Sequence, residues 1–248
     1  TEITEPLTGS KNFEGTFDGN GKTVNVNING NQSYVGLFGS NNGQISNINV
    51  AGTISGTSSY VGGICGSNNG QISNINVAGT ISGTSDHVGG ICGENTKNGE
   101  IINCGNSATV TGKRFVGGIC GSNKQTITGC SNEGSITAKD RYAGGIAGRN
   151  GNDIIDALVE NCTNSGDVTC DSYKKYIGYN DKEMAYYSAD NSSYTVIGKV
   201  GNSWHQIHFN DKVFSTKTNP NSLSVSLKPE FVSDGKLLKF TVSITNNT

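Results

Sequence analysis

The sequence of 248 residues has few prolines, methionines and tryptophans, with 3 Pro, 1 Met and 1 Trp, and only 15% of its residues are charged. So few charges argue against a charged disordered segment. The formal net charge of −2 provides no basic footprint for nucleic acid or for an anionic membrane surface. No apolar run approaches the roughly 18 residues of a membrane-spanning helix. We therefore expect no nucleic-acid partner and no membrane insertion in this part of the chain.

Familiar metal motifs are also missing. The 7 Cys include no CxxC pair with zinc-finger spacing. The string His205-Gln206-Ile207-His208 lacks the glutamate of a helical HExxH motif, and its flanks Trp204 and Phe209 suggest a strand or a cap. We expect no metal and no cofactor.

Repetition is the dominant feature that is present. Residues 39–59 read GSNNGQISNINVAGTISGTSS, and residues 66–86 repeat this segment with only the last residue changed. Tetrads of the form GxxG recur at intervals of 27, 27, 28 and 27 residues, beginning at Gly36, Gly63, Gly90, Gly118 and Gly145. The segment YIGYN at 176–180 resembles a sixth copy, after an insertion at 151–158.

Aligned on these tetrads, the copies form columns of like residues. An aromatic or histidine column precedes the tetrads: Tyr34, Tyr60, His87, Phe115 and Tyr142. One asparagine column follows them: Asn41, Asn68, Asn95, Asn123 and Asn150. A second is Asn47, Asn74, Asn103, Gly129 and Asn161. Two columns contain cysteine, with Cys65, Cys92 and Cys120 in one and Cys104, Cys130 and Cys162 in the other.

The columns predict an all-β fold. Short β-branched runs such as 45–50, bounded by Gly and Asn turns, are typical of strands, and no segment has a sustained helical period. A coil of about 27 residues must stack on its neighbours at about 4.8 Å to bury its apolar side chains. We predict a parallel β-helix or β-solenoid and favour a right-handed one. Its asparagines would form ladders and its glycines would supply positive φ at corners.

The domain organisation follows from where the repeat begins and fails. We expect an N-terminal cap and first rung at 1–33, solenoid repeats at 34–180 and a C-terminal cap at 181–210. Residues 211–248 contain two alternating runs, 223–227 and 240–244, joined through Asp234-Gly235, and predict a β-hairpin or the start of a β-sandwich.

The repeated segments resemble a known family. The pattern [Tyr/Phe]-Val-Gly-Gly-Ile-Cys-Gly-Ser-Asn, followed by Ile-x-Asn-Cys-x-Asn, is similar to the GLUG repeat of bacterial surface and secreted proteins, over about residues 13–179. Such repeats also occur in non-catalytic regions of immunoglobulin A-cleaving metallopeptidases. The resemblance implies an extracellular, non-catalytic module, on the bacterial cell surface or secreted. Ile48 and Ile75 stand where later repeats have Cys.

The cysteines allow two interpretations. Stacked neighbours about 4.8 Å apart come within disulfide range, but parallel side chains disfavour the required torsion. Buried thiol columns are favoured, because free Cys packs as a small hydrophobic residue.

A glycan-cleaving β-helix is the alternative function, because such enzymes gather acidic residues on adjacent rungs. Acidic residues are sparse here, but six charged residues are candidate ligand-binding positions: Glu133, Lys139, Asp140, Arg141, Arg149 and Asp167. Two Thr/Ser columns, Thr53/Thr80/Thr109/Ser135 and Ser55/Ser82/Thr111/Thr137, resemble the hydroxyl arrays of ice-binding solenoids.

The repeats favour a non-catalytic function over the enzyme. We expect a cell-surface module for cell adhesion or a rigid stalk that presents a neighbouring domain. Its expected partners are a host glycan or glycoprotein, or neighbouring domains of the same chain.

Overall fold

The structure, a computed structural model, describes residues 2–151 and 157–170 in full and, beyond them, the backbone of strands at 179–180, 193–200, 203–210, 223–232 and 237–246. The chain divides into two compact units, residues 1–182 and 183–248. No helix occurs among these residues, and so none of them forms a helix that could cross a membrane.

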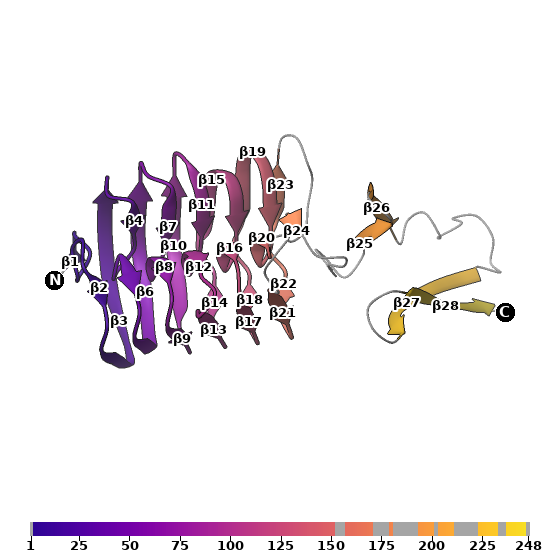
Figure 1. The fold of residues 1–248 in the computed structure, drawn as a ribbon, viewed down its shortest axis with the longest axis horizontal. Helices are drawn as coiled ribbons and strands as arrows, with labels where there is room; N and C mark the ends of the chain where they lie inside the picture. The colour runs from indigo at the N-terminus through magenta and orange to yellow at the C-terminus, as the bar shows by residue number, and fades with distance from the viewer. Residues whose placement is uncertain are drawn as a thin grey trace. The chain divides into compact units, whose positions relative to one another are not determined.

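The first unit is a β-solenoid, as the repeats predict. Its strands are parallel and stacked in coils (Figure 1), and residues one repeat apart lie side by side. Thr53, for example, pairs with Thr80, which in turn pairs with Thr109. The period of the sequence is therefore one turn of the solenoid, whose right-handed winding stays a prediction.

Most strands of the coils belong to one 17-stranded sheet. The first coils contribute β1 (Glu2–Ile3), β3 (Thr16–Gly30), β4 (Tyr34–Val35), β6 (Gln44–Gly56), β7 (Tyr60–Gly62), β9 (Gln71–Ser73), β10 (Asn76–Gly83) and β11 (Asp86–Gly89). Later coils contribute β13 (Glu100–Ile102), β14 (Gly105–Asn106), β15 (Thr109–Gly117), β17 (Thr126–Thr128), β18 (Ser131–Asn132), β19 (Ile136–Gly144), β21 (Leu158–Glu160), β22 (Thr163–Asn164) and β23 (Val168–Cys170).

The other strands of the coils form a seven-stranded parallel sheet. Its strands are β2 (Asn12–Phe13), β5 (Ser40–Asn41), β8 (Cys65–Asn68), β12 (Cys92–Asn95), β16 (Cys120–Asn123), β20 (Ala147–Asn150) and β24 (Tyr179–Asn180). In β24, Asn180 pairs with Asn150, so the described end of the sixth copy predicted at 176–180 continues the stack.

The first asparagine column forms the predicted ladder. The side chains of Asn41, Asn68, Asn95, Asn123 and Asn150 are buried. Each amide nitrogen donates to the amide oxygen of the next coil, at 2.8, 2.8, 2.8 and 2.7 Å. A buried polar group without a partner costs about 1–3 kcal/mol, so the ladder strongly favours this register over a slipped one.

The core is a set of apolar columns inside the coils. Ile45, Ile72, Ile101 and Ile127 form one column, and all four are fully buried. Because each coil is thin, its side chains are covered mainly by the coils on either side.

The second asparagine column has a role beyond the predicted one. Its members adopt left-handed φ of 52–54°, and Gly129, which replaces Asn in one coil, has φ 65°. Asparagine tolerates this conformation better than other residues with a Cβ. We predicted that glycine would supply positive φ at the corners, but here asparagine does so in most coils. The Asn74 amide still donates to Asn47 at 3.2 Å, in an exposed position.

The second unit contains two antiparallel hairpins. β25 (Ser193–Val200) pairs with β26 (Ser203–Asn210), within the predicted C-terminal cap. His205 and His208 both lie on strand β26. β27 (Leu223–Val232) pairs with β28 (Leu237–Asn246), which confirms the predicted C-terminal hairpin. The Asp234-Gly235 connection and most of the insertion at 151–158 lie outside the described residues.

Candidate functional site

The aromatic column forms a continuous stack along one corner of the coils. The ring centroids of Tyr34, Tyr60, His87, Phe115 and Tyr142 are separated by 5.2, 5.0, 5.0 and 4.9 Å. Their interplanar angles fall from 28° to 10° along the stack. This spacing follows the rise of the coils and lies within the range of favourable aromatic pairs. We call these five residues the aromatic ladder.

An unusual backbone conformation supports the ladder. His87, Phe115 and Tyr142 have φ of 57°, 53° and 65°. Bulky residues rarely adopt this region, and such strain persists only where the surroundings enforce it. Ring stacking and the tight packing of the coils provide that constraint.

The last glycine of each tetrad permits this packing. A Cβ on Gly121 would lie 2.5 Å from the carbonyl carbon of His87 and 2.6 Å from the nitrogen of Val88. The backbone at Gly121 thus passes directly against the aromatic corner of the preceding coil. The glycine column of one coil therefore packs against the aromatic column of the preceding coil.

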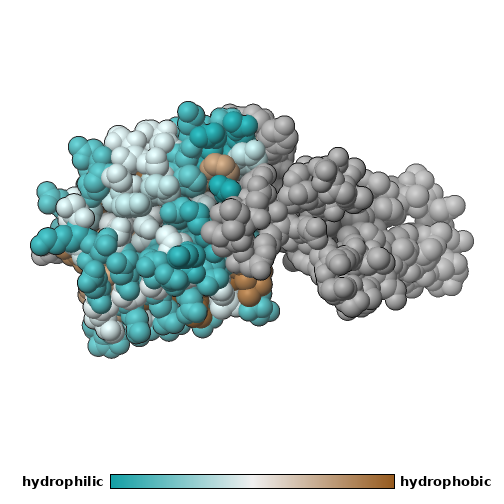
Figure 2. Space-filling view, in the orientation of Figure 1, coloured by the Kyte–Doolittle hydropathy of each residue, from teal (hydrophilic) through white to brown (hydrophobic). Residues whose placement is uncertain are grey.

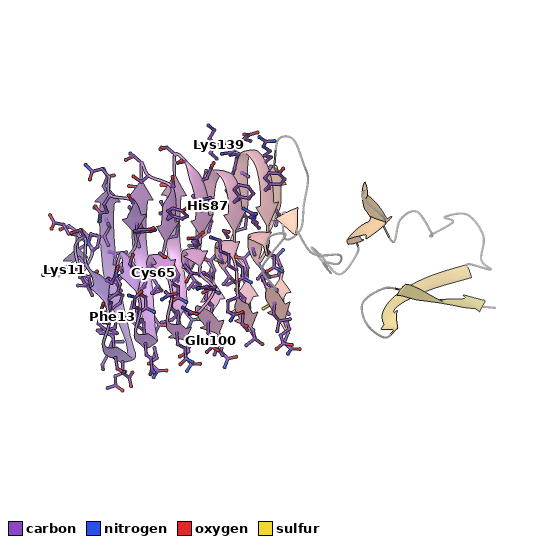
Figure 3. The ribbon with its side chains drawn as sticks, in the orientation of Figure 1. Lys11, Phe13, Cys65, His87, Glu100 and Lys139 are labelled. Atoms are coloured by element: carbon purple, nitrogen blue, oxygen red, sulfur yellow. The ribbon has the colours of Figure 1, made fainter. Side chains whose placement is uncertain are left out.

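The ladder lies at the surface without being fully exposed. Tyr34 is the most open ring, at 38% exposure, and the other four are half-buried. Burial lowers the pKa of His87, whose Nδ1 has no hydrogen-bond partner among the described residues. His87, labelled in Figure 3, is therefore a neutral aromatic member of the stack near neutral pH.

Arginines flank the ladder. The guanidinium carbons of Arg114 and Arg149 lie 5.9 and 5.8 Å from the Phe115 centroid, and that of Arg141 lies 5.6 Å from the Tyr142 centroid. At partly exposed sites such cation–π contacts contribute about 0.5–1 kcal/mol each. They also place guanidinium groups over the rings of the ladder, an arrangement that can bind anionic or ring-shaped ligands.

Asp86 holds one of these arginines in place. Arg114 donates through Nε to Asp86 Oδ1 at 2.9 Å and forms a second contact with the other carboxylate oxygen. Burial alone would raise the pKa of Asp86, but the ion pair outweighs it and the pKa is lowered. On the neighbouring sheet, Lys124 pairs with Glu94 at 2.7 Å.

The structure brings four of the six candidate residues to the later part of the ladder. Arg141 and Arg149 contact neighbouring rings, as described above. Asp140 forms a weak ion pair with Arg141, in which Oδ2 lies 3.9 Å from Nε. The preceding Lys139 is exposed. These four residues and the ladder form the candidate binding surface.

Glu133 and Asp167 lie on a different side of the coils. Register places Glu133 beside Ser165 and Asp167 beside Ser135, so the two carboxylates belong to adjacent coils but are offset by two positions. Both residues are exposed. Among the fully described residues, no group of three or more His, Cys, Asp and Glu could hold a metal ion.

The cysteines are free thiols, of which six are buried and Cys162 is half-buried. Cys65 and Cys92, in adjacent coils, have sulfur atoms 3.5 Å apart. Burial raises the pKa of Cys92 and Cys120 well above the ordinary range. Thiols held in their neutral form are poor nucleophiles, so these columns do not form a reactive site.

The second cysteine column also completes the backbone hydrogen bonding of a corner. The N–H groups of Cys104 and Cys130 each donate to the sulfur of the next coil, both at 3.4 Å. Each sulfur also lies within 3.2–3.4 Å of the carbonyl oxygen two residues earlier in its own chain, a geometry that suits S–H donation.

The sequence interpretation missed a third asparagine ladder. Asn106 donates to Asn132 at 2.7 Å, and Asn132 donates to Asn164 at 2.6 Å. These residues replace Val50 and Val77 of the earlier coils. The signal was present, because Ile-x-Val becomes Cys-x-Asn in the same three coils where this ladder forms.

The hydroxyl columns lie on the broad face of β6, β10, β15 and β19. Thr53, Thr80, Thr109 and Ser135 are exposed and in register. Asn27 precedes this column in the first coil and Asp167 follows it in the last described one. Figure 2 shows that the visible face of the coils is mostly hydrophilic or neutral.

Comparison with known proteins supports the family assignment. The family described as the GLUG motif matches residues 84–111 and 140–169. Each matched segment spans one coil, from the aromatic corner to the apolar strand that follows. No curated protein and no solved structure matched the chain significantly. The chain therefore contains GLUG-motif repeats, in the two coils that the family model matches.

Proposed function

We propose that this chain is a non-catalytic module of a bacterial cell surface or secreted protein, which holds an adhesive surface or a neighbouring domain on a rigid support. The observation that carries the proposal is the uninterrupted asparagine ladder from Asn41 to Asn150. It links the five coils from Asn41 to Asn150 through buried side chains. A solenoid tied in this way resists bending and local opening better than one held by apolar contacts alone.

The surface of the coils supports a binding role. The aromatic ladder and its arginines form a surface along several coils, and solenoids characteristically bind partners over such extended surfaces. The expected partner is a host glycan or glycoprotein, or a neighbouring domain of the same chain.

The test is an assay for turnover and binding on the same preparation. The purified chain is incubated with a panel of host and bacterial polysaccharides, and new reducing ends and unsaturated products are measured alongside binding to a glycan array. We expect no product above the buffer control. Turnover that is lost on Glu133→Gln or Asp167→Asn would contradict a non-catalytic role.

A further inference from the structure

The N-terminal end of the solenoid has a step. Ile3 of β1 pairs with Val26 of the first coil, and the N–H of Leu7 donates to the carbonyl of Leu37 at 2.7 Å. The cap thus passes from Ile3 to Leu7 while the coil beneath it passes from Val26 to Leu37. Because the cap takes a much shorter path, it leaves the aromatic corner of the first coil uncovered.

A hollow of about 280 Å³ lies in this step. Together with two glycines, residues of the cap and the first coil line it: Ser10, Lys11, Gln32, Ser33, Tyr34 and Ser40. Its volume lies just below the roughly 300–1,000 Å³ of drug-sized ligand sites, which suits a ligand of one ring. Figure 3 labels Lys11 at this end of the coils.

Tyr34 supplies the apolar wall of the hollow. It is the first ring of the ladder and stacks on Tyr60 on one side, with centroids 5.2 Å apart. Among the described residues no ring stacks on its other side, and Tyr34 keeps 38% of its surface exposed. An aromatic face is electron-rich and attracts the polarised C–H groups of a sugar ring.

The only charged side chain that lines the hollow is positive. Lys11 is the only charged residue of the lining, is exposed, and has no ion-pair partner among the described residues. The remaining side chains are hydroxyls and an amide, which can both donate and accept hydrogen bonds. A ligand that satisfies all these groups has an apolar ring face, several hydroxyls and one negative charge.

We propose that this hollow binds a single pyranose unit that carries a carboxylate. The sugar ring stacks on Tyr34, its carboxylate pairs with Lys11, and its hydroxyls bond to Ser10, Gln32 and Ser33. A charge-assisted hydrogen bond is roughly twice as strong as a neutral one, so the carboxylate should dominate selectivity. This inference rests on the proposed function, to which it adds the class of ligand.

The test uses the complete chain and three methyl glycosides, a glucuronide, a galacturonide and a sialoside, with methyl glucoside as the neutral comparison. Saturation-transfer NMR detects binding, and titration measures affinity. We expect at least one acidic glycoside to bind about tenfold more tightly than the glucoside, a difference of about 1.4 kcal/mol. Failure of all three to bind, or equal binding of the neutral sugar, would overturn the proposal.

Variants locate the site. Tyr34→Ala should weaken binding at least about tenfold, whereas Tyr34→Phe, which keeps the ring, should bind within about threefold of the wild type. Lys11→Gln should remove the preference for the acidic sugar, whereas Lys22→Gln, the same charge change outside the hollow, should not. Undiminished binding by both Tyr34→Ala and Lys11→Gln would place the ligand elsewhere. Thermal unfolding of each variant checks the fold, and failure of sugar binding would leave the turnover test of the module unaffected.

Discussion

Asn68 and Asn95, one coil apart and both fully buried, are joined by a hydrogen bond of 2.8 Å between their side-chain amides. Asn95 repeats this bond to the next coil at 2.8 Å and also donates to the carbonyl of Gly99 at 3.0 Å. One side chain therefore fixes the register between coils and the turn within its own coil.

Replacing Asn95 should therefore be costly. Asn95→Ala leaves the Asn68 and Asn123 amides and the Gly99 carbonyl without this partner, and we expect a loss of about 2–4 kcal/mol in the free energy of unfolding. Asn76→Ala is the matched control, because Asn76 is exposed and bonds only at the surface, to Asn49 at 3.1 Å. It should cost about 0.5 kcal/mol or less. Urea titration measures both, and similar losses would show that the buried ladder has no special role.

How much of the ladders could be predicted from the sequence depends on the column. The Asn41-to-Asn150 column was predicted as a ladder because identical residues at a fixed period must stack. The Asn106 ladder was missed because valine occupies its position in earlier coils. Asn47 and Asn74 stack as predicted, but their positive φ was not predicted, because an alignment of columns does not report backbone conformation.

The candidate site was harder to predict. The aromatic column was visible, but the left-handed φ of His87, Phe115 and Tyr142 was not predicted, because these residue types do not signal it. The hollow at Tyr34 depends on the short path of the cap, and no repeat in the sequence reports that path. Arg141 and Arg149 were predicted as one patch from their proximity in sequence, without the rings that connect them.

The close packing at Gly121 predicts that a side chain at this position would destabilise the fold. Gly121→Ala would place its Cβ against the backbone of His87, Gly93 and Val88, at 2.5–2.6 Å. Backbone cannot move aside as a flexible side chain can, so we expect a loss of about 3 kcal/mol or more. Gly15→Ala is the control, because its Cβ would meet only the Phe13 ring at 3.5 Å, and it should be nearly neutral. A stable Gly121→Ala protein with unchanged urea midpoint would contradict the packing described.

Because His87 is buried in its neutral form, we predict that the free energy of unfolding decreases in mild acid. Burial lowers the pKa of folded His87 below its unfolded value of about 6.5, and Arg149 and Lys124 act in the same direction against Glu94 and Asp86. The contribution of neutral His87 to the free energy of unfolding is present above pH 6.5. It is lost as the pH falls through the folded pKa, by up to about 1.4 kcal/mol per pH unit. His87→Tyr, which copies Tyr60 and Tyr142 of the same column, should lack this component. Parallel urea titrations from pH 7 to 5 measure the difference, and identical pH profiles would exclude a neutral His87 in the stack.

The thiol columns predict a loss of stability in alkali. Burial raises the pKa of Cys92 and Cys120, and hydrogen bonding with Cys104 together with burial raises the pKa of Cys130 to about 12. Because the unfolded thiols ionise near pH 8.5–9, the stabilisation is complete below that pH and declines above it. Each thiol should contribute a slope approaching about 1.4 kcal/mol per pH unit.

A single substitution tests this interpretation. Cys92→Ala copies Ala147 of the same column and should reduce the alkaline slope by one thiol's share, whatever it does to stability at pH 7. Urea titrations at pH 8, 9 and 10 give the slopes. A wild-type stability that is constant over this range would mean that the thiols are not buried in their neutral form.

The central claim, that the ladders hold the coils as one rigid stack, is tested most directly by a distance measurement along the coils. Asn27 and Ser135 occupy the same exposed column four coils apart. Spin labels on an Asn27→Cys/Ser135→Cys variant, with the wild type treated in parallel to report any labelling of native thiols, give the distribution of distances by double electron–electron resonance. We predict a single narrow distribution centred near four coil spacings of about 4.8 Å, or about 19 Å. A broad or multimodal distribution would contradict the account.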